Sequence, residues 1–282
     1  MARHQLLQQL THTALMVVRD IGLTEALRRS GQVLPRGAQL WLRDRRMNAR
    51  IRAGDSASVV AELGILVDEP ELKRILDNAY TLLAERAGGS EPGDYLEFGV
   101  YVGTSMACMH EVLEARGLDK VRMFGFDSFE GLPADTHTDD TSQIESWRAG
   151  DLKVPYEACR ANLTQKGVNW DRTALIKGFF EDTLTQELVE EHGIRKAGVI
   201  MVDSDLYSSA KTALAFCEPL ISDHAVILFD DWWPDTLGAA RTGERRAFEE
   251  FLTSHPELTA EELESYAPES AKVFLVSRRP PA

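Results

Sequence analysis

The stretch Asp94-Tyr-Leu-Glu-Phe-Gly-Val-Tyr-Val-Gly-Thr-Ser105 decides the fold of this chain. It begins as a short apolar segment ending in Glu97 and Gly99, and a turn of small residues around Gly103 follows. From Met106 to Leu113, apolar residues recur at helical spacing. In open α/β sheets, a strand followed by a glycine-rich turn and a helix is the unit that binds a nucleotide cofactor. Because many ordinary turns also carry two glycines, this stretch predicts a ligand site only together with the rest of the chain.

Apolar strands alternate with helical segments on both sides of this stretch. The expected strands are Val121–Phe126, Ala174–Lys177, Gly198–Val202, Ala225–Phe229 and a late edge strand, Lys272–Ser277. The expected helices are Leu72–Leu83, which Asp68 starts and Gly88-Gly89 ends, Thr183–His192 and Ser208–Pro219. This alternation predicts an α/β fold, with a mostly parallel sheet and helices on both faces.

Composition excludes some classes of protein. The chain has 282 residues, of which 44% are hydrophobic, so it can bury a full core. Its net charge of -14 argues against broad nucleic-acid binding, which needs a basic surface. The three cysteines are far apart and form no Cys-x-x-Cys pair, which indicates buried thiols in a reducing cytoplasm. No signal peptide and no membrane-spanning segment is expected.

The first sixty residues differ in charge from the rest. We expect residues 1–60 to form a helical, basic extension and residues 61–282 to form the main domain. The segment from Gln5 to Arg29 has a leucine stripe, and arginines then surround Leu40-Trp41-Leu42. A solvated face or a subunit contact explains this pattern best, and a homo-oligomer would bury the apolar part. A patch for an anionic substrate or a membrane surface is the alternative.

Acidic residues end the predicted strands, where ligands bind in open α/β sheets. They are Glu97, Asp127, Asp203, Asp205, Asp230 and Asp231. Any one of them can instead cap the next helix, but their recurrence on four strands favours a site. Asp127 ends the strand after the glycine turn, where a carboxylate can accept both ribose hydroxyls of a dinucleotide or of S-adenosylmethionine. Tyr101 argues against the dinucleotide, because a pyrophosphate needs a small residue there.

The last four of these aspartates predict a metal centre. Carboxylates on neighbouring strand ends repel one another unless a cation or protons neutralise them. A set of oxygen ligands suits Mg²⁺, Mn²⁺ or Ca²⁺ better than zinc.

Five motifs in this order resemble the macrocin and mycinamicin O-methyltransferase family. They are Leu-Glu-Phe-Gly-Val-Tyr-Val-Gly-Thr-Ser, Gly-Phe-Asp-Ser-Phe-Glu-Gly-Leu-Pro, Lys-Gly-Phe-Phe-Glu-Asp-Thr-Leu, Val-Asp-Ser-Asp-Leu-Tyr-Ser-Ser and Leu-Phe-Asp-Asp-Trp, between Asp94 and Trp233. The resemblance implies a Rossmann-like class I methyltransferase sheet. It also implies S-adenosylmethionine as methyl donor, Mg²⁺ or another oxygen-preferring divalent cation, and a hydroxyl acceptor on the sugar of a natural product.

The same resemblance assigns roles to residues. It places the cofactor at Glu97, Gly99, Gly103, Ser105, Asp127, Ser128, Gly178 and Asp182, and the metal at Asp203, Asp230 and Asp231. Asp203 would also take the proton of the acceptor hydroxyl. Asp205 would support the site or cap the next helix. Trp232-Trp233 and Pro234 depart from the family pattern, and these indoles either stack on the acceptor or pack in the core.

Three alternatives remain beside this interpretation. Asp203-Ser-Asp205 has the acid-x-acid form of a metal-dependent glycosyltransferase, although this leaves Asp230-Asp231 unexplained. A nicotinamide oxidoreductase lacks its Gly-x-Gly-x-x-Gly spacing here. A non-catalytic, methyltransferase-like partner would not need the complete set of acids. The polar segment from Pro133 to Pro155 is either a lid or a disordered loop, and the sequence does not identify the acceptor.

Overall fold

The computed structural model describes residues 43, 45–47, 49–51, 53–63, 67–86, 92–133, 149–232 and 243–279. The predicted helix at 5–29, Arg36, Leu40-Trp41-Leu42 and Arg52 of the basic run, residues 134–148 of the polar segment, Trp233 and Pro234 lie outside these residues. Backbone contacts divide the chain into two units, residues 1–46 and 47–282, and the fold below belongs to the second. The boundary near residue 60, the homo-oligomer and the cytoplasmic location stay predictions. Among the described residues, no helix is long and apolar enough to cross a bilayer.

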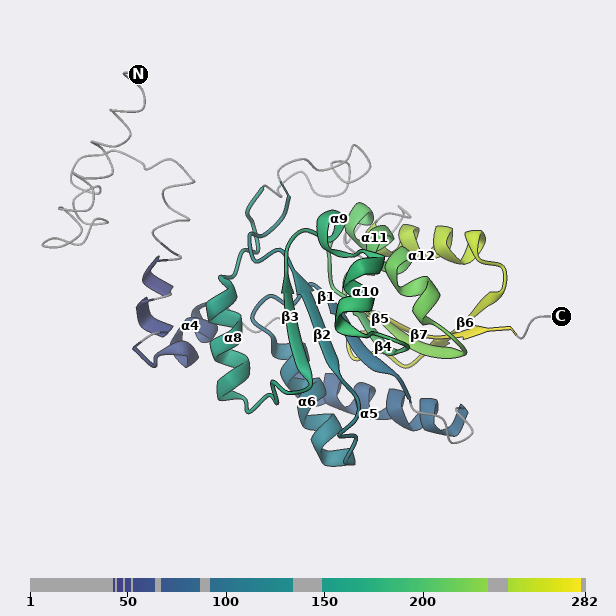
Figure 1. The fold of residues 1–282 in the computed structure, drawn as a ribbon, viewed down its shortest axis with the longest axis horizontal. Coiled ribbons are helices and arrows are strands. Elements are labelled where there is room, and N and C mark those ends of the chain that lie inside the picture. The colour runs from purple at the N-terminus through teal and green to yellow at the C-terminus, as the bar shows by residue number, and fades with distance from the viewer. Residues whose placement is uncertain are drawn as a thin grey trace, which may run out of the picture. The chain divides into compact units, whose positions relative to one another are not determined.

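A seven-stranded sheet forms the centre of the second unit, with the order β3-β2-β1-β4-β5-β7-β6 (Figure 1). The strands are β1 (Asp94–Phe98), β2 (Met123–Asp127), β3 (Thr173–Lys177), β4 (Ala197–Val202), β5 (His224–Phe229), β6 (Leu258–Leu263) and β7 (Lys272–Arg278). The first five strands pair in parallel, and β7 is antiparallel to both β5 and β6. The predicted mostly parallel α/β sheet is therefore confirmed.

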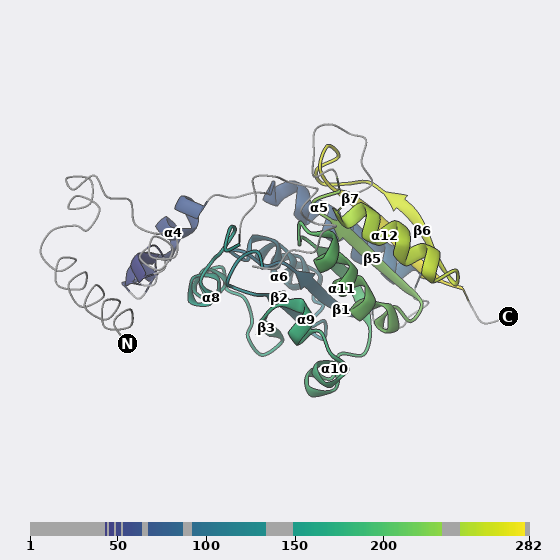
Figure 2. The same ribbon diagram turned by 90° about the horizontal axis from the view of Figure 1, so that it is seen from above.

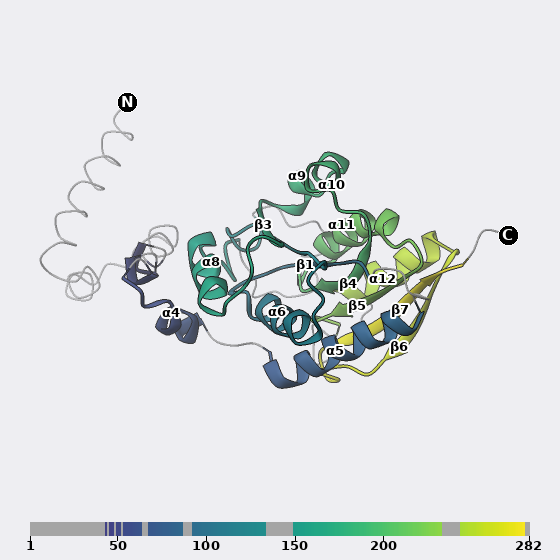
Figure 3. The same cartoon turned by 60° about the horizontal axis from the view of Figure 1, so that its bottom comes forward.

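Helices cover both faces of this sheet (Figures 2 and 3). The bounds of the helices are α4 (Ser56–Leu63), α5 (Glu69–Arg86), α6 (Thr104–Arg116), α8 (Tyr156–Gln165), α9 (Phe180–Thr183), α10 (Gln186–His192), α11 (Tyr207–Cys217), the 3-10 turn η1 (Glu218–Leu220) and α12 (Gly243–Ser254). Helix α4 does not cover the sheet but lies beside α8. Helices α5, α6 and α8 pack on one face, whereas α11 and α12 pack on the other. Parallel strands joined by helices require this layering, because each crossover crosses a face of the sheet.

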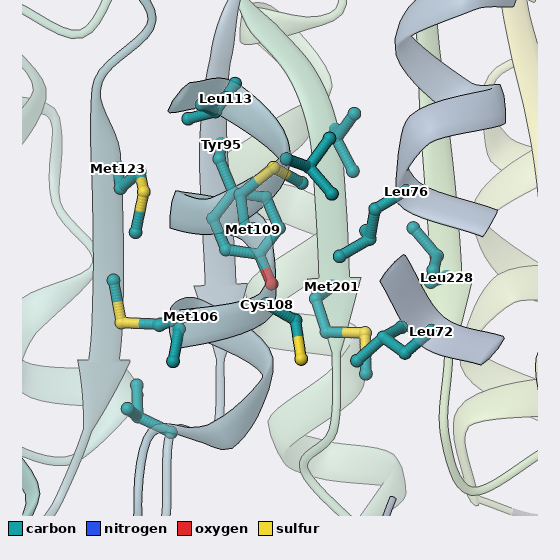
Figure 4. Close-up of a cluster of buried hydrophobic side chains, with 14 of the residues drawn as sticks. Leu72, Leu76, Tyr95, Met106, Cys108, Met109, Leu113, Met123, Met201 and Leu228 are labelled. Atoms are coloured by element: carbon teal, nitrogen blue, oxygen red, sulfur yellow. The ribbon is translucent and has the colours of Figure 1, made fainter. Parts of the chain in front are cut away.

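Alternating side chains divide the core into two apolar layers. On β4, Val199 and Met201 face the layer beneath α5 and α6, whereas Ile200 and Val202 face the layer beneath α11. Figure 4 shows the first layer, in which Leu72 and Leu76 of α5 approach Met201 and Leu228. The helix start predicted at Asp68 is confirmed, because its carboxylate accepts the N–H of Glu71 at 3.2 Å.

The three cysteines are buried free thiols, as the sequence indicated.

Two sequence predictions about elements are wrong. The strand from Lys272 lies inside the sheet, between β5 and β6, and β6 forms the edge. The sequence hid β6 because its Ala260-Glu-Glu262 segment is exposed and charged, a pattern that protects an edge strand from pairing further. The helix predicted from Thr183 to His192 starts too early. Helix α10 begins at Gln186, where Thr185 caps it by accepting the N–H of Leu188, and Thr183 ends the separate short helix α9.

The carboxyl ends of the central strands meet at one edge of the sheet. The N–H of Gly99 donates to Phe126 at 2.9 Å, and that of Asp203 donates to Phe98 at 2.9 Å. The N–H of Asp230 continues the series to Val202 at 3.0 Å. These bonds place the residues after β1, β4 and β5 side by side, so the acids predicted from separate motifs gather in one place.

Candidate active site

The glycine turn after β1 is shaped by close approaches of its own backbone. Gly99 has φ 94°, and a Cβ there would lie 1.7 Å from the carbonyl oxygen of Asp203. Gly103 has φ 83°, and a Cβ there would lie 2.8 Å from the Leu163 side chain on α8. We expected both glycines to admit a ligand. Gly99 does line the cavity described below, but Gly103 does not, and it is needed for packing against α8.

Asp127 at the end of β2 organises that turn. Its Oδ2 accepts the N–H of Val100 at 2.8 Å and of Tyr101 at 3.0 Å, and its Oδ1 accepts the N–H of Phe129 at 2.6 Å. Burial raises the pKa of Asp127, and these three N–H donors oppose the rise. Tyr101 has φ 51°, a left-handed conformation that is unusual for an aromatic residue and that these bonds stabilise. Asp127 also lines the cavity, as predicted.

Glu97 lies beneath the turn, fully buried, and does not line the cavity. It accepts the hydroxyl of Tyr95 at 2.5 Å and that of Ser105 at 2.6 Å. Burial raises the pKa of Glu97 to about 8 against the effect of these two donors. Glu97 therefore reaches a ligand only through Ser105, which does line the cavity.

The exits of β2 and β3 complete this half of the site. The Ser128 hydroxyl donates to the carbonyl of Gly131 at 2.9 Å and closes a tight turn. Ser128 and Asp182 line the cavity, together with Phe179. Gly178 does not line it; a Cβ there would lie 2.4 Å from the Thr183 methyl group, so this glycine serves the turn into α9.

The three aspartates predicted to bind metal converge at the ends of β4 and β5. Carboxylate oxygens of Asp203, Asp230 and Asp231 all lie within 4.8 Å of one another. Burial, followed by repulsion from Asp230 and Asp231, raises the pKa of Asp203 well above its usual value. Burial raises the pKa of Asp231 to about 6. Three mutually repelling carboxylates suit a hard divalent ion chemically.

One of the two sequence hypotheses for Asp205 was that it caps the next helix, and the structure does not support this role. Helix α11 begins at Tyr207, and its N-cap residue is Leu206, which makes no side-chain cap hydrogen bond. Asp205 instead lines the cavity, with φ 61°, a strained conformation for an aspartate. Burial and then repulsion by Asp231 raise the pKa of Asp205. Asp205 therefore supports the carboxylate cluster.

Two residues that sequence reasoning missed also hold the cluster. The Tyr266 hydroxyl donates to Oδ1 of Asp230. Glu244, at the start of α12, accepts the backbone N–H groups of Ser204 and Asp231, each at 3.0 Å. No sequence motif indicates these residues, because their partners are up to forty positions away and two of them are backbone groups.

Trp232 belongs to the core and does not line the cavity. It is 7% exposed, and its ring centroid lies 5.4 Å from that of Phe229 and 5.1 Å from that of Phe274. The interpretation that Trp232 stacks on an acceptor is therefore wrong.

One cavity of about 540 Å³ connects the glycine turn with the carboxylate cluster. Its wall is apolar at Val67, Leu132 and Leu152. Its acids are Asp127, Glu181, Asp182, Asp203, Asp205, Asp230 and Asp231. Within the described part of the chain, no lysine, arginine or histidine lines the cavity. The cavity is large enough for a nucleoside-sized cofactor beside a second molecule, and it favours neutral or cationic ligands.

The sheet order and the glycine turn facing the acid that ends β2 define the Rossmann-like methyltransferase fold. A family model described as macrocin-O-methyltransferase (TylF) matches residues 72–258. The chain belongs to this family, as the five motifs indicated.

Curated relatives support the same assignment. The 8-demethyl-8-(2,3-dimethoxy-alpha-L-rhamnosyl)-tetracenomycin-C 4'-O-methyltransferase of Streptomyces olivaceus is 35% identical over 164 residues, covering 57% of this chain and 60% of the relative. The mycinamicin III 3''-O-methyltransferase of Micromonospora griseorubida is 26% identical over 146 residues, covering 50% of this chain and 56% of the relative. The matched part thus spans less than two thirds of either relative.

A solved structure, that of the O-methyltransferase NovP, has the same fold. It superposes with a TM-score of 0.58 at 23% identity, covering 74% of this chain and 80% of that protein. This likeness confirms the architecture, which was predicted from the order of strands and motifs.

Proposed function

We propose that this protein transfers a methyl group from S-adenosylmethionine to a hydroxyl on the sugar part of a natural product or other glycoconjugate. The observation that carries the proposal is a single cavity joining the turn held by Asp127 to the cluster of Asp203, Asp230 and Asp231. Family membership and the sugar O-methyltransferases among the relatives support the same reaction.

The cofactor would lie along the glycine turn. Asp127 would accept the ribose hydroxyls with the lone pairs that its three N–H donors leave free. Gly99, Ser105, Ser128 and Asp182 would contact the rest of the cofactor from the cavity wall. The other three predicted cofactor residues would act indirectly. Glu97 would hold Ser105 in place, and Gly103 and Gly178 would allow the two turns behind the cavity wall. S-adenosylmethionine supplies an electrophilic methyl group.

The metal would be held by the three aspartates. A bound Mg²⁺ or similar cation lowers the pKa of a hydroxyl that it contacts. The aspartates would hold the acceptor hydroxyl at a fixed distance from the cofactor, which accounts for much of the rate of an in-line displacement. Asp203 would accept the proton, because it follows β4, next to the Gly99 turn.

The alternatives are weaker on the same geometry. A glycosyltransferase binds a nucleotide diphosphate, and the acidic residues lining this cavity, with no basic residue among those described, disfavour such an anion. A non-catalytic partner gives no reason to keep mutually repelling carboxylates buried at the cavity.

Calorimetry of the full chain tests this proposal. S-adenosylhomocysteine should bind wild-type protein, and Mg²⁺ should then bind the complex. The double variant Asp230→Asn/Asp231→Asn should keep its affinity for S-adenosylhomocysteine and lose Mg²⁺ binding by at least about a hundredfold, because two of three ionic ligands are gone.

Activity is the second measurement. Labelled S-adenosylmethionine should methylate members of a panel of O-demethyl glycosides, and a chelator or Asp203→Asn should abolish the transfer. Failure to bind S-adenosylhomocysteine would exclude the methyltransferase reaction, and transfer that resists the chelator would exclude the metal.

A further inference from the structure

Glu244 is the most completely buried carboxylate around the cluster, and no catalytic role explains it. It belongs to the first turn of α12 and is 0% exposed, whereas all three aspartates of the cluster are partly exposed. Its Oε1 accepts the N–H of Ser204 at 3.0 Å, and its Oε2 accepts the N–H of Asp231 at 3.0 Å. Glu244 does not line the cavity, so it contacts no ligand there.

These two bonds join the two chain segments that carry the aspartates. Ser204 follows Asp203 directly after β4, and Asp231 is itself in the cluster after β5. The ladder between β4 and β5 ends at Val202 and Phe229, and the N–H of Asp230 makes the last backbone bond between them. Beyond that point, the Glu244 carboxylate links the two segments through its hydrogen bonds to Ser204 and Asp231, and so sets their spacing.

Helix α12 is itself fixed, so the position of Glu244 is well determined. The Tyr207 hydroxyl on α11 donates to Glu250 at 2.6 Å, and the Arg246 guanidinium lies 4.2 Å from the Tyr207 ring centroid. On the inner side, the ring centroid of Phe248 lies 4.9 Å from that of Phe229 on β5. A carboxylate on such a helix holds its partners at a fixed distance.

Burial, followed by repulsion from Asp231, raises the pKa of Glu244 well above its usual value. Within the part of the chain that the structure describes, Glu244 has backbone N–H donors and no cationic side chain as partners. A buried charge without a counter-charge is costly, and a cation at the adjacent aspartates would offset it.

We propose that Glu244 is a positioning residue, which aligns Asp203 and Asp231 through their backbones and strengthens cation binding at the cluster. This inference rests on the proposed metal site.

The test is a Mg²⁺ titration, by calorimetry, of the full chain saturated with S-adenosylhomocysteine. In Glu244→Gln, the amide has the same shape as the carboxylate, but it has no charge. Its NH₂ group would face one of the two backbone N–H donors, and because it cannot accept, that hydrogen bond would be lost. We expect Mg²⁺ affinity to fall about tenfold or more, as for other residues that orient metal ligands. The affinity for S-adenosylhomocysteine should stay within about twofold, because the glycine turn is untouched.

Melting with and without Mg²⁺ separates positioning from general stability. A residue that only stabilises the fold would lower the melting temperature equally in both conditions. We expect Glu244→Gln to reduce mainly the increase in melting temperature that Mg²⁺ produces. Glu249→Gln is the matched control, because Glu249 lies on the same helix and pairs with Arg245 at 3.0 Å, away from the cluster. This control should bind Mg²⁺ like the wild type.

Glu244→Asp keeps the charge but shortens the side chain, and it replaces the glutamine variant if that variant does not fold. We expect it also to weaken Mg²⁺ binding. Wild-type Mg²⁺ affinity in a folded Glu244 variant would overturn the inference alone. A wild-type chain that binds S-adenosylhomocysteine but no divalent cation would overturn both this inference and the metal part of the proposed function. If the wild-type chain bound neither S-adenosylhomocysteine nor a divalent cation, the proposed function as a whole would be overturned.

Discussion

The turn around Asp127 and the cluster around Asp203 are both built from acids at strand ends, but they differ in how the negative charge is compensated. Asp127 receives three backbone N–H donors and Glu97 receives two hydroxyls. In the cluster, the Tyr266 hydroxyl donates to Asp230, and Asp205 is hydrogen-bonded to Asp231. Burial and then repulsion from Asp230 and Asp231 raise the pKa of Asp203. The charge of the first region is compensated by donors within the protein, whereas in the proposed metal site a cation would compensate the charge of the second.

This contrast separates two kinds of binding site. The turn is already ordered by its own hydrogen bonds, so a cofactor meets a preformed surface. The aspartates repel one another, and the protein holds them together through its backbone and through Glu244. In the proposed metal site, the stability lost by gathering these charges would be the source of the affinity for a cation.

The largest effect is expected where the two regions are in contact, because one substitution there should disrupt both the turn and the cluster. In Gly99→Ala, the new Cβ would lie 1.7 Å from the Asp203 carbonyl oxygen, and a positive φ adds strain. We expect a loss of about 3 kcal/mol or more of stability, and loss of both S-adenosylhomocysteine and Mg²⁺ binding. Denaturant unfolding and calorimetry measure these effects.

Gly117→Ala is the control for this substitution. Gly117 has φ 66°, and a Cβ there would meet nothing within 4 Å. It should cost only about 1 kcal/mol and leave both ligands bound. Equal effects of the two substitutions would show that backbone strain, and not the contact with Asp203, decides the result.

A smaller change should affect the turn alone. Asp127→Asn keeps one oxygen to accept N–H donors but removes the charge that would receive the ribose hydroxyls. We expect the affinity for S-adenosylhomocysteine to fall about tenfold to a hundredfold, as for loss of hydrogen bonds to a charged group. Mg²⁺ binding measured without cofactor should not change. If Mg²⁺ binding also fell, the two regions would not be independent.

The pH dependence of stability should show the smallest difference between the regions. Asp231 and Glu97 have pKa values raised from 3.8 to about 6 and from 4.5 to about 8. The folded protein then binds more protons than the unfolded chain between these values, so stability falls as pH rises through them. Metal-free protein should therefore melt at progressively lower temperature between about pH 5 and about pH 8.

Mg²⁺ should cancel only the part of this fall that comes from the aspartates, because Glu97 lies away from the cluster. Scanning calorimetry of wild type and Glu97→Gln, with and without Mg²⁺, measures both parts. In the presence of Mg²⁺, the remaining fall should disappear in Glu97→Gln. A wild-type profile that Mg²⁺ leaves unchanged would contradict the proposed metal site at these aspartates.

The sequence by itself determined the fold class, the family and the acids at the strand ends. These features depend on local patterns: apolar strands, glycine turns and an acid directly after each strand. It also grouped Asp203, Asp205, Asp230 and Asp231, because parallel neighbouring strands end at the same edge of a sheet. The family resemblance then selected three of them, Asp203, Asp230 and Asp231, which the structure brings together.

Only the tertiary structure decided how those acids differ. It placed Glu97 behind the cavity, gave Asp127 its three N–H donors and moved Trp232 into the core. It also brought Glu244 and Tyr266 to the cluster, and made β6 the edge of the sheet. These facts depend on contacts between residues far apart in the chain, many of them to backbone N–H groups. No side-chain pattern encodes such partners, because every residue except proline offers the same N–H.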